Sequence, residues 1–300
     1  MITARSQTTL ASPASVTGRG YWSGAEVRVE FRPAPVDSGI AFVRDDLGPT
    51  ARVPLHIAAQ RPTPRRTILS AETAAGETVS VEMVEHVAAA LAGLGVDNCE
   101  VGVTAAEMPG MDGSSAAFVA AIEGVGLARQ AAAADPLVIT QPVRCERGNT
   151  WIEARPPTDG RLSIEFNLDF GPASAIPHQW TVLDVDPLSF RVELAAARTF
   201  VLKSEADAIR AAGLASHVTA QDLLIFEDDR PGSPPLENPL RYPDECVRHK
   251  VLDVVGDLAL AGRPIVGRIV ACRSGHQLNA ELVRKVLATE SRSMPRRRSA

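Results

Sequence analysis

The segment 246-CVRHKVLDVVGDLALAG-262 combines a clear helix pattern with an unusual polar face. With 3.6 residues per turn, the side chains of this helix fall on two opposite faces. One face carries an apolar stripe made of Val251, Leu252, Val255 and Leu258. The other face carries His249, Asp253 and Asp257 at four-residue intervals. Polar helix faces mostly carry Lys, Glu and Arg, so this stack of one histidine and two aspartates needs a chemical explanation.

The composition is that of a globular protein without a nucleic-acid partner. The 300 residues suffice for one large or two ordinary domains, and 45% of them are hydrophobic and 22% charged. A net charge of −5 and an aromatic fraction of 4% argue against nucleic-acid binding. The four cysteines show no C-x-x-C spacing, which is typical of free thiols in a reducing compartment. With neither a signal-peptide pattern nor a long apolar segment, we expect a cytoplasmic protein with no stable membrane insertion.

Strand and helix patterns fall into two halves of the chain. In the first half, alternation predicts a half-buried strand at 26–36, and apolar periodicity predicts helices at 82–94 and 112–128. The stretch 129-RQAAAADP-136 has no pattern of its own and is the predicted domain boundary. Asn279 is a plausible N-cap for the last helix. The second half is predicted to contain strands near 137–145, 150–155, 162–169 and 265–272, a surface loop at 229–239, and helices around 204–212, 246–262 and 279–289.

A short internal match links the two halves. Both 84-VEHVAAALAGLG-95 and 247-VRHKVLDVVGDL-258 place V-x-H at the start of a helix. Chance resemblance between helices rich in Ala, Val and Leu is common, so the match is weak evidence for duplication. If the halves are duplicated, His86 and His249 stand at equivalent points of two similar domains and could face each other.

These histidines could belong to a metal site. A catalytic zinc takes three protein ligands, and His249 and Asp253, one helical turn apart, are near enough to bind one ion. His86 is the natural third ligand, and Glu85 beside it could reach the metal's water without binding the metal. Plainer interpretations stay open at this point. An i, i+4 His–Asp pair is more often a surface hydrogen bond, Glu is favoured in the first turn of any helix, and His276 could be an ordinary loop residue.

Longer stretches of the chain carry a resemblance to a known family. They are 17-TGRG-20, 32-RPAPVDSGIAFVRDDL-47, 84-VEHVAAALAGLGVDN-98, 107-EMPGMDGSSAAFV-119, 198-RTF-200, 247-VRHKVLDVVGDL-258 and 274-SGHQLN-279. In order and with family-like spacing from about residue 7 to 288, they resemble the UDP-3-O-acyl-N-acetylglucosamine deacetylase family. These are the zinc amidases that commit precursors to lipid A synthesis.

The resemblance implies a role for each residue that matches a family motif. His86, His249 and Asp253 stand at the zinc-ligand positions, and Fe²⁺ also accepts this ligand set. Glu85 matches the general base, and His276 matches the residue that protonates or stabilises the other side of the reaction. Asp257 matches a carboxylate that orients His276, and Thr199 matches a hydroxyl donor to the oxyanion. Lys250 matches a lysine linked to catalysis and to the nucleotide–sugar substrate. Phe166 and Phe200 match two aromatics lining that substrate's site, and core packing is the alternative for both.

The resemblance also implies a fold. We expect an α+β protein of two similar domains, each a β-sheet layered on α-helices, with the active site at the domain interface. The domains are expected at 1–130 and 136–290, with an insert near 199–227 that encloses a fatty acyl chain. Residues 291–300, which contain the basic run 296-RRR-298, are expected to form a flexible tail.

The implied reaction is zinc-dependent hydrolysis of the N-acetyl group of UDP-3-O-((3R)-hydroxyacyl)-N-acetylglucosamine, giving the free amine and acetate. A monomer is favoured. The alternatives are a non-hydrolytic paralogue that binds UDP-sugar lipids and an amidase for a different acylated sugar. Three stretches depart from the family pattern: Tyr21-Trp22 replace a Leu-His pair, 215-ASHV-218 replaces a Gly-rich turn, and Met83 replaces a small hydroxyl residue. The change at 215–218 alters the expected insert and keeps the second alternative open.

Overall fold

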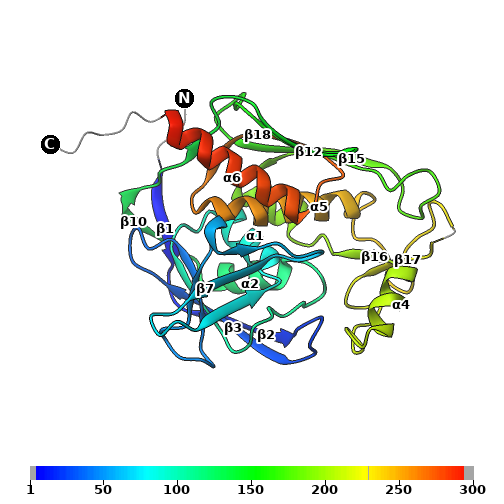
Figure 1. The fold of residues 1–300 in the computed structure, drawn as a ribbon, viewed down its shortest axis with the longest axis horizontal. Helices are drawn as coiled ribbons and strands as arrows, with labels where there is room; N and C mark the ends of the chain where they lie inside the picture. Colours follow the sequence, from blue (N-terminus) through cyan, green and yellow to red (C-terminus); the bar gives the residue numbers. More distant parts are fainter. Residues whose placement is uncertain (1–4, 229, 294–300) are drawn as a thin grey trace.

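Two helices form the centre of the molecule. The computed structural model describes residues 5–228 and 230–293, and it mixes helices with several β-sheets, which confirms the predicted α+β class. Helices α1 (Glu85–Gly93) and α5 (Glu245–Leu258) pack against each other. One larger sheet lies above this pair and another below it in Figure 1.

The first larger sheet is built from the N-terminal part of the chain. In spatial order its strands are β2 (Ala14–Arg19), β3 (Glu26–Pro33), β9 (Cys99–Val103), β4 (Ile40–Arg44) and β5 (Arg52–Pro54). Buried apolar and more exposed charged side chains alternate along β3, so the strand predicted at 26–36 is present but ends at Pro33. Phe31 of β3 meets Phe118 of α2 (Ala116–Val125) edge-on, with ring centroids 6.3 Å apart, so α2 packs on this sheet. The helix predicted at 112–128 is therefore present in a shorter form.

A small sheet leads into α1. Its strands are β6 (Gln60–Arg61), β7 (Ile68–Glu72) and β8 (Thr78–Glu82), preceded by a short 3-10 helix, η1 (Ile57–Ala59). The helix predicted at 82–94 begins three residues later than expected, because Glu82 still belongs to β8. Met83, between strand and helix, has a φ of 57°.

The second larger sheet is built from the C-terminal part of the chain. In spatial order its strands are β12 (Val143–Arg147), β13 (Thr150–Arg155), β18 (Ile265–Cys272), β14 (Leu162–Leu168) and β15 (Gln179–Val185), and β11 (Leu137–Val138) also pairs with β18. Strand β18 runs parallel to β14 and antiparallel to β13. Helices α5 and α6 (His276–Ser293) pack on this sheet, and the 3-10 helix η3 (Ala259–Ala261) joins α5 to β18.

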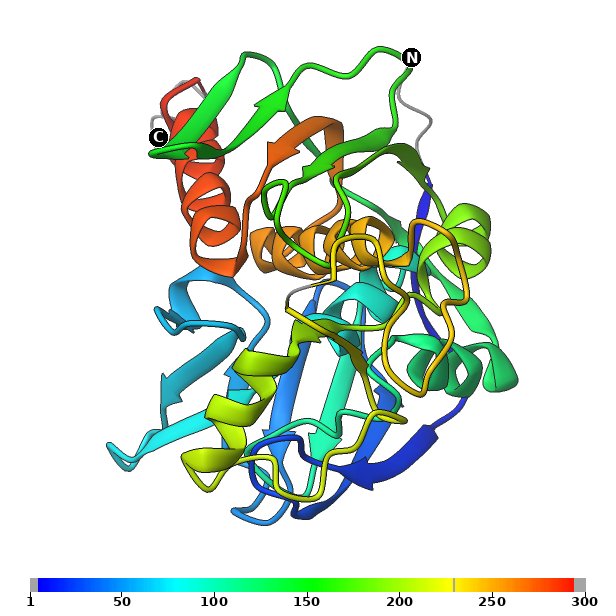
Figure 2. The same cartoon turned by 90° about the vertical axis from the view of Figure 1, so that its right-hand side faces the viewer.

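A separate βαβ unit projects at one side of the molecule. Strand β16 (Phe200–Leu202), helix α4 (Lys203–Ala211) and strand β17 (Leu224–Phe226) follow one another, and β16 pairs in parallel with β17. Helix α4 faces the viewer in Figure 2, below α5. The short helices α3 (Pro187–Ser189) and η2 (Phe190–Leu194) precede the unit. The unit occupies the segment where an insert was expected, at 199–227.

Two local predictions were wrong. The stretch 129–136 is not patternless, because strand β10 (Leu127–Ala133) pairs antiparallel with β1 (Ser6–Leu10) at the other end of the N-terminal region. Alanine gives little strand signal, and the partner strand lies far away in the chain. The division into domains at 1–130 and 136–290 stays a prediction.

Asn279 is not an N-cap. Helix α6 begins at His276, and the Asn279 side chain donates from within the helix to Asp257. The same helix extends to Ser293, so residues 291–293 are helical, whereas 294–300 lie outside the described residues; the flexible tail stays a prediction. Among the helices of the described chain, none has the length and apolar character needed to cross a membrane.

Candidate active site

Three side chains that could bind a metal meet where α1 packs on α5. His86 lies in the first turn of α1, and His249 and Asp253 lie one turn apart on α5. Oδ1 of Asp253 is 3.4 Å from Nε2 of His249 and 3.8 Å from Nε2 of His86. The two imidazole rings are nearly perpendicular, and their centroids are 5.1 Å apart. All three residues are buried, and their possible ligand atoms lie within 4.8 Å of one another.

The close approach of the two helices brings these ligands together. A Cβ atom at Gly256 of α5 would lie 2.2 Å from the carbonyl oxygen of Glu85, in the first turn of α1. The alanines at 88–90 of α1 are fully buried. Small residues leave little bulk between helix axes, so His86 reaches across to the ligands of α5. The predicted encounter of the two V-x-H histidines is therefore confirmed.

The protonation states of this group suit a divalent cation. Burial lowers the pKa of His86 to about 3 and also lowers the pKa of His249, so both imidazoles are neutral at pH 7. Burial opposes ionisation of Asp253, but the Lys250 ammonium, 2.7 Å from Oδ2, and the surrounding imidazoles together outweigh it and hold the pKa of this carboxyl below its usual range. Nδ1 of His249 donates to the carbonyl oxygen of Ala197 at 3.1 Å, which leaves Nε2 free as a ligand. Two neutral imidazoles and one ionised carboxylate fit the donor set of a catalytic zinc.

Glu85 lies beside this group and is not one of the three potential ligands. Its side chain is buried, and Oε2 accepts a hydrogen bond from the backbone N–H of Thr67 at 3.0 Å. Burial raises the pKa of Glu85 to about 7. A carboxylate with a pKa near the working pH is well suited to accept a proton and release it again.

Asp257, one turn beyond Asp253 on α5, binds the histidine that begins α6. Its Oδ2 accepts from Nδ1 of His276 at 2.8 Å and from the Asn279 amide at 2.9 Å, and its Oδ1 accepts from the Thr67 hydroxyl at 2.8 Å. Burial of the imidazole opposes its protonation, but the Asp257 carboxylate outweighs this effect and raises the pKa of His276 to about 9. The imidazole therefore carries a proton at neutral pH and can donate it from Nε2.

Thr199, Phe200 and Lys250 lie on the walls around the group. The backbone N–H of Thr199 donates to the carbonyl oxygen of Gly113 at 2.7 Å, which ties this residue to the loop before α2. Phe200 meets His249 edge-on, with ring centroids 6.1 Å apart. The Lys250 side chain is 17% exposed and reaches the same space.

A cavity of about 700 Å³ joins these side chains. It is lined by the three potential ligands and by Glu85, His276, Thr199, Phe200 and Lys250, whereas Asp257 lies behind the wall. The βαβ unit contributes apolar lining from Ala206, Ile209, Val218 and Ile225. Polar and aromatic lining comes from the segments that follow β14 and β18: Asp169, Phe170, Arg273 and Ser274.

Residues 7–288 match the family model described as LpxC: UDP-3-O-acyl N-acetylglycosamine deacetylase. The chain belongs to this family. The UDP-3-O-acyl-N-acetylglucosamine deacetylases of Shewanella halifaxensis and Shewanella piezotolerans are each 38% identical to it over 285 residues, and that of Shewanella loihica is 39% identical. Each of these alignments covers 95% of this chain and 90% of the relative.

One residue expected in the substrate site of this deacetylase family lies elsewhere. Phe166 is fully buried in β14 and is absent from the cavity wall. The alternation of β14 places it on the same face as Ile164, which is also fully buried, and this face packs under α5. For Phe166, the buried position favours the alternative of core packing over the expected place in the nucleotide–sugar site.

Two residues of the site were missed by sequence reasoning. Phe170 is 47% exposed, lines the cavity and meets Phe200 edge-on with ring centroids 6.0 Å apart. An aromatic just beyond the end of a predicted strand was the available signal. Thr67 donates to both Glu85 and Asp257, and nothing in its local sequence marks it.

The departures from the pattern of the deacetylase family lie on the cavity wall. Tyr21, Trp22, Met83 and Ala215 all line it. The Tyr21 hydroxyl donates to the carbonyl oxygen of Asp222 at 2.5 Å, so the N-terminal region is tied to the segment between α4 and β17. Ala215 has a φ of 51°, in the left-handed region that favours glycine, which explains why a Gly-rich turn suits this position.

Proposed function

We propose that this chain hydrolyses the N-acetyl group of UDP-3-O-acyl-N-acetylglucosamine, releasing acetate and the free amine in the committed step of lipid A biosynthesis. The observation that carries the proposal is the convergence of His86, His249 and Asp253 with a buried carboxylate and a protonated imidazole on one cavity. Membership in the deacetylase family and the names of the relatives support the same reaction.

His86, His249 and Asp253 would hold the metal. Zn²⁺ is the proposed ion, and Fe²⁺ also suits two imidazoles and one carboxylate. When bound, such a cation would polarise the acetyl carbonyl and make a water easier to deprotonate. Lys250 would hold Asp253 in its ionised form through the contact at 2.7 Å.

Glu85 would act as the general base. Its raised pKa and its position beside His86 suit it to remove a proton from the attacking water as the new C–O bond forms. The N–H of Thr67 fixes one carboxylate oxygen, which leaves the other to accept this proton. The Thr199 hydroxyl would donate to the oxyanion that develops on the acetyl oxygen.

His276 would act as the general acid. The Asp257 carboxylate keeps its imidazole protonated and fixes its ring, so Nε2 can deliver a proton to the amide nitrogen as the C–N bond breaks. The electron pair of that bond stays on nitrogen, and the sugar leaves as the free amine. The proton that Glu85 takes from water restores the imidazolium after acetate departs.

Two kinds of lining would receive the two ends of the substrate. The apolar side chains of the βαβ unit are suited to the 3-O-acyl chain. Phe200 and Lys250 would contact the sugar and nucleotide, and the exposed Phe170 ring and Arg273 are suited to the base and the diphosphate. We also propose that the protein acts in the cytoplasm as a monomer; one chain supplies every residue of this constellation, so the site needs no second copy.

Acetate release from UDP-3-O-(3-hydroxyacyl)-N-acetylglucosamine, measured together with metal content, tests the proposal. Metal-dependent acetate release is the expected result. A protein that binds stoichiometric metal without releasing acetate contradicts it and points to a non-hydrolytic UDP-sugar-lipid-binding paralogue or to an amidase for a different acylated sugar. The altered wall at Tyr21, Trp22 and Ala215 makes the latter the first substrate class to screen.

A further inference from the structure

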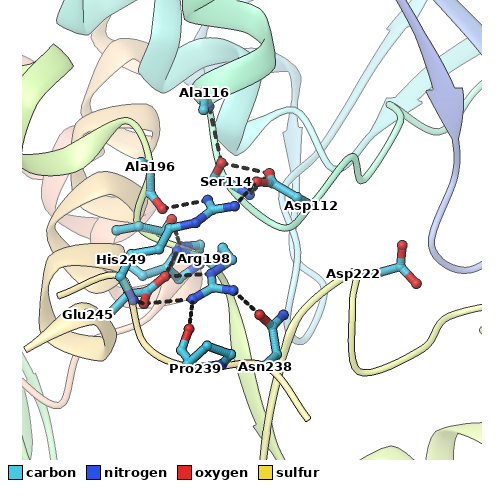
Figure 3. A network of polar contacts seen from close by, with 12 residues as sticks. Asp112, Ser114, Ala116, Ala196, Arg198, Asp222, Asn238, Pro239, Glu245 and His249 are labelled. Carbon is cyan, nitrogen blue, oxygen red and sulfur yellow. Dashed lines mark hydrogen bonds and ion pairs between the residues drawn. The ribbon is translucent and has the colours of Figure 1, made fainter. Parts of the chain in front are cut away.

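Arg198 and Glu245 form an ion pair inside the protein, beside the candidate metal site (Figure 3). Their side chains are 3% and 0% exposed, and Nε of Arg198 lies 2.7 Å from Oε1 of Glu245. Nη2 of Arg198 reaches Oε2 of the same carboxylate at 3.0 Å, so the contact is bidentate. Asn238 and the carbonyl oxygen of Pro239 also accept hydrogen bonds from the guanidinium. Each of its three nitrogens therefore has a partner.

The same pair connects the segment at 197–199 to the start of α5. The backbone N–H of Arg198 donates to Oε1 of Glu245 at 3.1 Å. One residue earlier, the carbonyl oxygen of Ala197 accepts the Nδ1 proton of His249 at 3.1 Å. Because Glu245 and His249 are four residues apart on α5, two adjacent residues of the segment are bound to two consecutive turns of one helix face.

We propose that the Arg198–Glu245 pair positions a metal ligand. The pair fixes the carbonyl group of Ala197, this carbonyl selects the His249 tautomer with its proton on Nδ1, and Nε2 then faces Asp253 as a free ligand. Neither member of the pair lines the cavity, so both act through His249. The inference rests on the proposed metal-dependent function. Groups that orient a histidine ligand commonly set metal affinity in this way.

The chemistry of arginine separates this role from simple charge pairing. The planar guanidinium contacts Glu245 through two nitrogens and Asn238 through the third. A lysine ammonium is a point charge on a flexible stem and cannot keep all three directions. Arg198→Lys therefore retains a positive charge beside Glu245 but releases the geometric constraint on the segment at 197–199.

The test is the Zn²⁺ affinity of the full-length protein, measured by competition with a chromophoric chelator. Arg198→Lys should raise the Kd by about 10–100-fold. Arg248→Lys is the matched control and should leave the Kd near the wild-type value. Arg248 also lies on α5, directly before His249, and pairs with Asp244 and Glu193, but its ion pairs do not involve the segment at 197–199.

A second measurement reports which nitrogen of the His249 ring carries the proton. In two-bond ¹H–¹⁵N spectra, His249 of the metal-free wild type should carry its proton on Nδ1, whereas Arg198→Lys should show mixed tautomers with unchanged far-UV circular dichroism. A folded Arg198→Lys variant with wild-type affinity overturns the proposal. A wild-type His249 protonated on Nε2 overturns it as well, whether or not the variant folds. A wild-type protein that binds no Zn²⁺ contradicts the proposed function instead.

Discussion

Nδ1 of His276 lies 2.8 Å from Oδ2 of Asp257, and the Asp257 side chain is fully shielded from solvent. The carboxylate stabilises the imidazolium more than burial disfavours it, so the pKa of His276 rises to about 9. The pKa of Glu85 rises to about 7 for the opposite reason, because burial disfavours its charged form. The two groups therefore occupy the states needed for a base and an acid within one pH window.

This window predicts a bell-shaped dependence of kcat/KM on pH. Activity should rise as Glu85 ionises, at or below about pH 7, and fall as His276 loses its proton, at or below about pH 9. A bound divalent cation favours the deprotonated form of both groups and therefore moves both limbs to lower pH. Asp257→Asn should move the alkaline limb to lower pH and leave the acid limb nearly in place. An alkaline limb that does not respond to this change would exclude His276 as the acid.

Glu85→Gln should separate metal binding from catalysis. The amide keeps the size of the side chain but cannot accept a proton from water, so acetate release should slow by about 10²–10⁴-fold. Metal content should stay at the wild-type level, because Glu85 is not among the three potential ligands. Parallel measurement of both quantities checks the prediction, and loss of the metal together with the activity would place Glu85 among the ligands.

Asp253→Ala and His249→Ala should each lose the bound metal, because two protein ligands rarely hold a catalytic zinc. Both side chains are buried, so their removal should also lower the free energy of unfolding by about 1–3 kcal/mol. Metal analysis after gel filtration and chemical denaturation measure the two effects. Stoichiometric metal in either folded variant would refute the ligand assignment.

The side of α4 that faces the cavity should set the preferred acyl length. Ala206 is 8% exposed and lines the cavity, so Ala206→Phe should exclude part of a long chain. Each excluded CH₂ group should add about 0.8 kcal/mol to the activation free energy that corresponds to kcat/KM. Ala208→Phe, on the exposed side of the same helix, is the control and should leave the profile unchanged. An equal loss of kcat/KM at every acyl length would show that the acyl chain binds elsewhere.

The pattern of α5 could be predicted because its information is local. The apolar stripe of α5 and the four-residue spacing of His249, Asp253 and Asp257 need only the geometry of one helix. His86 comes from a distant part of the chain, so the weak V-x-H echo could suggest it but spacing alone could not assign it. The resemblance to the deacetylase family supplied the roles of Glu85 and His276.

The remaining features depend on tertiary structure. Strand β10 pairs with β1 across most of the N-terminal region, and such pairing leaves little trace in a stretch rich in alanine. Thr67, just before β7, meets the two site carboxylates Glu85 and Asp257 only through the tertiary fold, because these residues lie on two different helices further along the chain. Phe166 and Phe170 are both plausible aromatics in the sequence, but Phe166 is buried within β14, whereas Phe170 lies beyond the end of this strand and is 47% exposed.

The most direct test of the central claim is a titration of metal-free wild-type protein with Zn²⁺, in which bound metal and acetate release are followed on the same sample. The substrate is UDP-3-O-(3-hydroxyacyl)-N-acetylglucosamine. The structure predicts that activity is absent without metal and rises in proportion to bound Zn²⁺ until the site formed by His86, His249 and Asp253 is filled. Full acetate release by the metal-free protein, or a filled site without acetate release, would contradict the account.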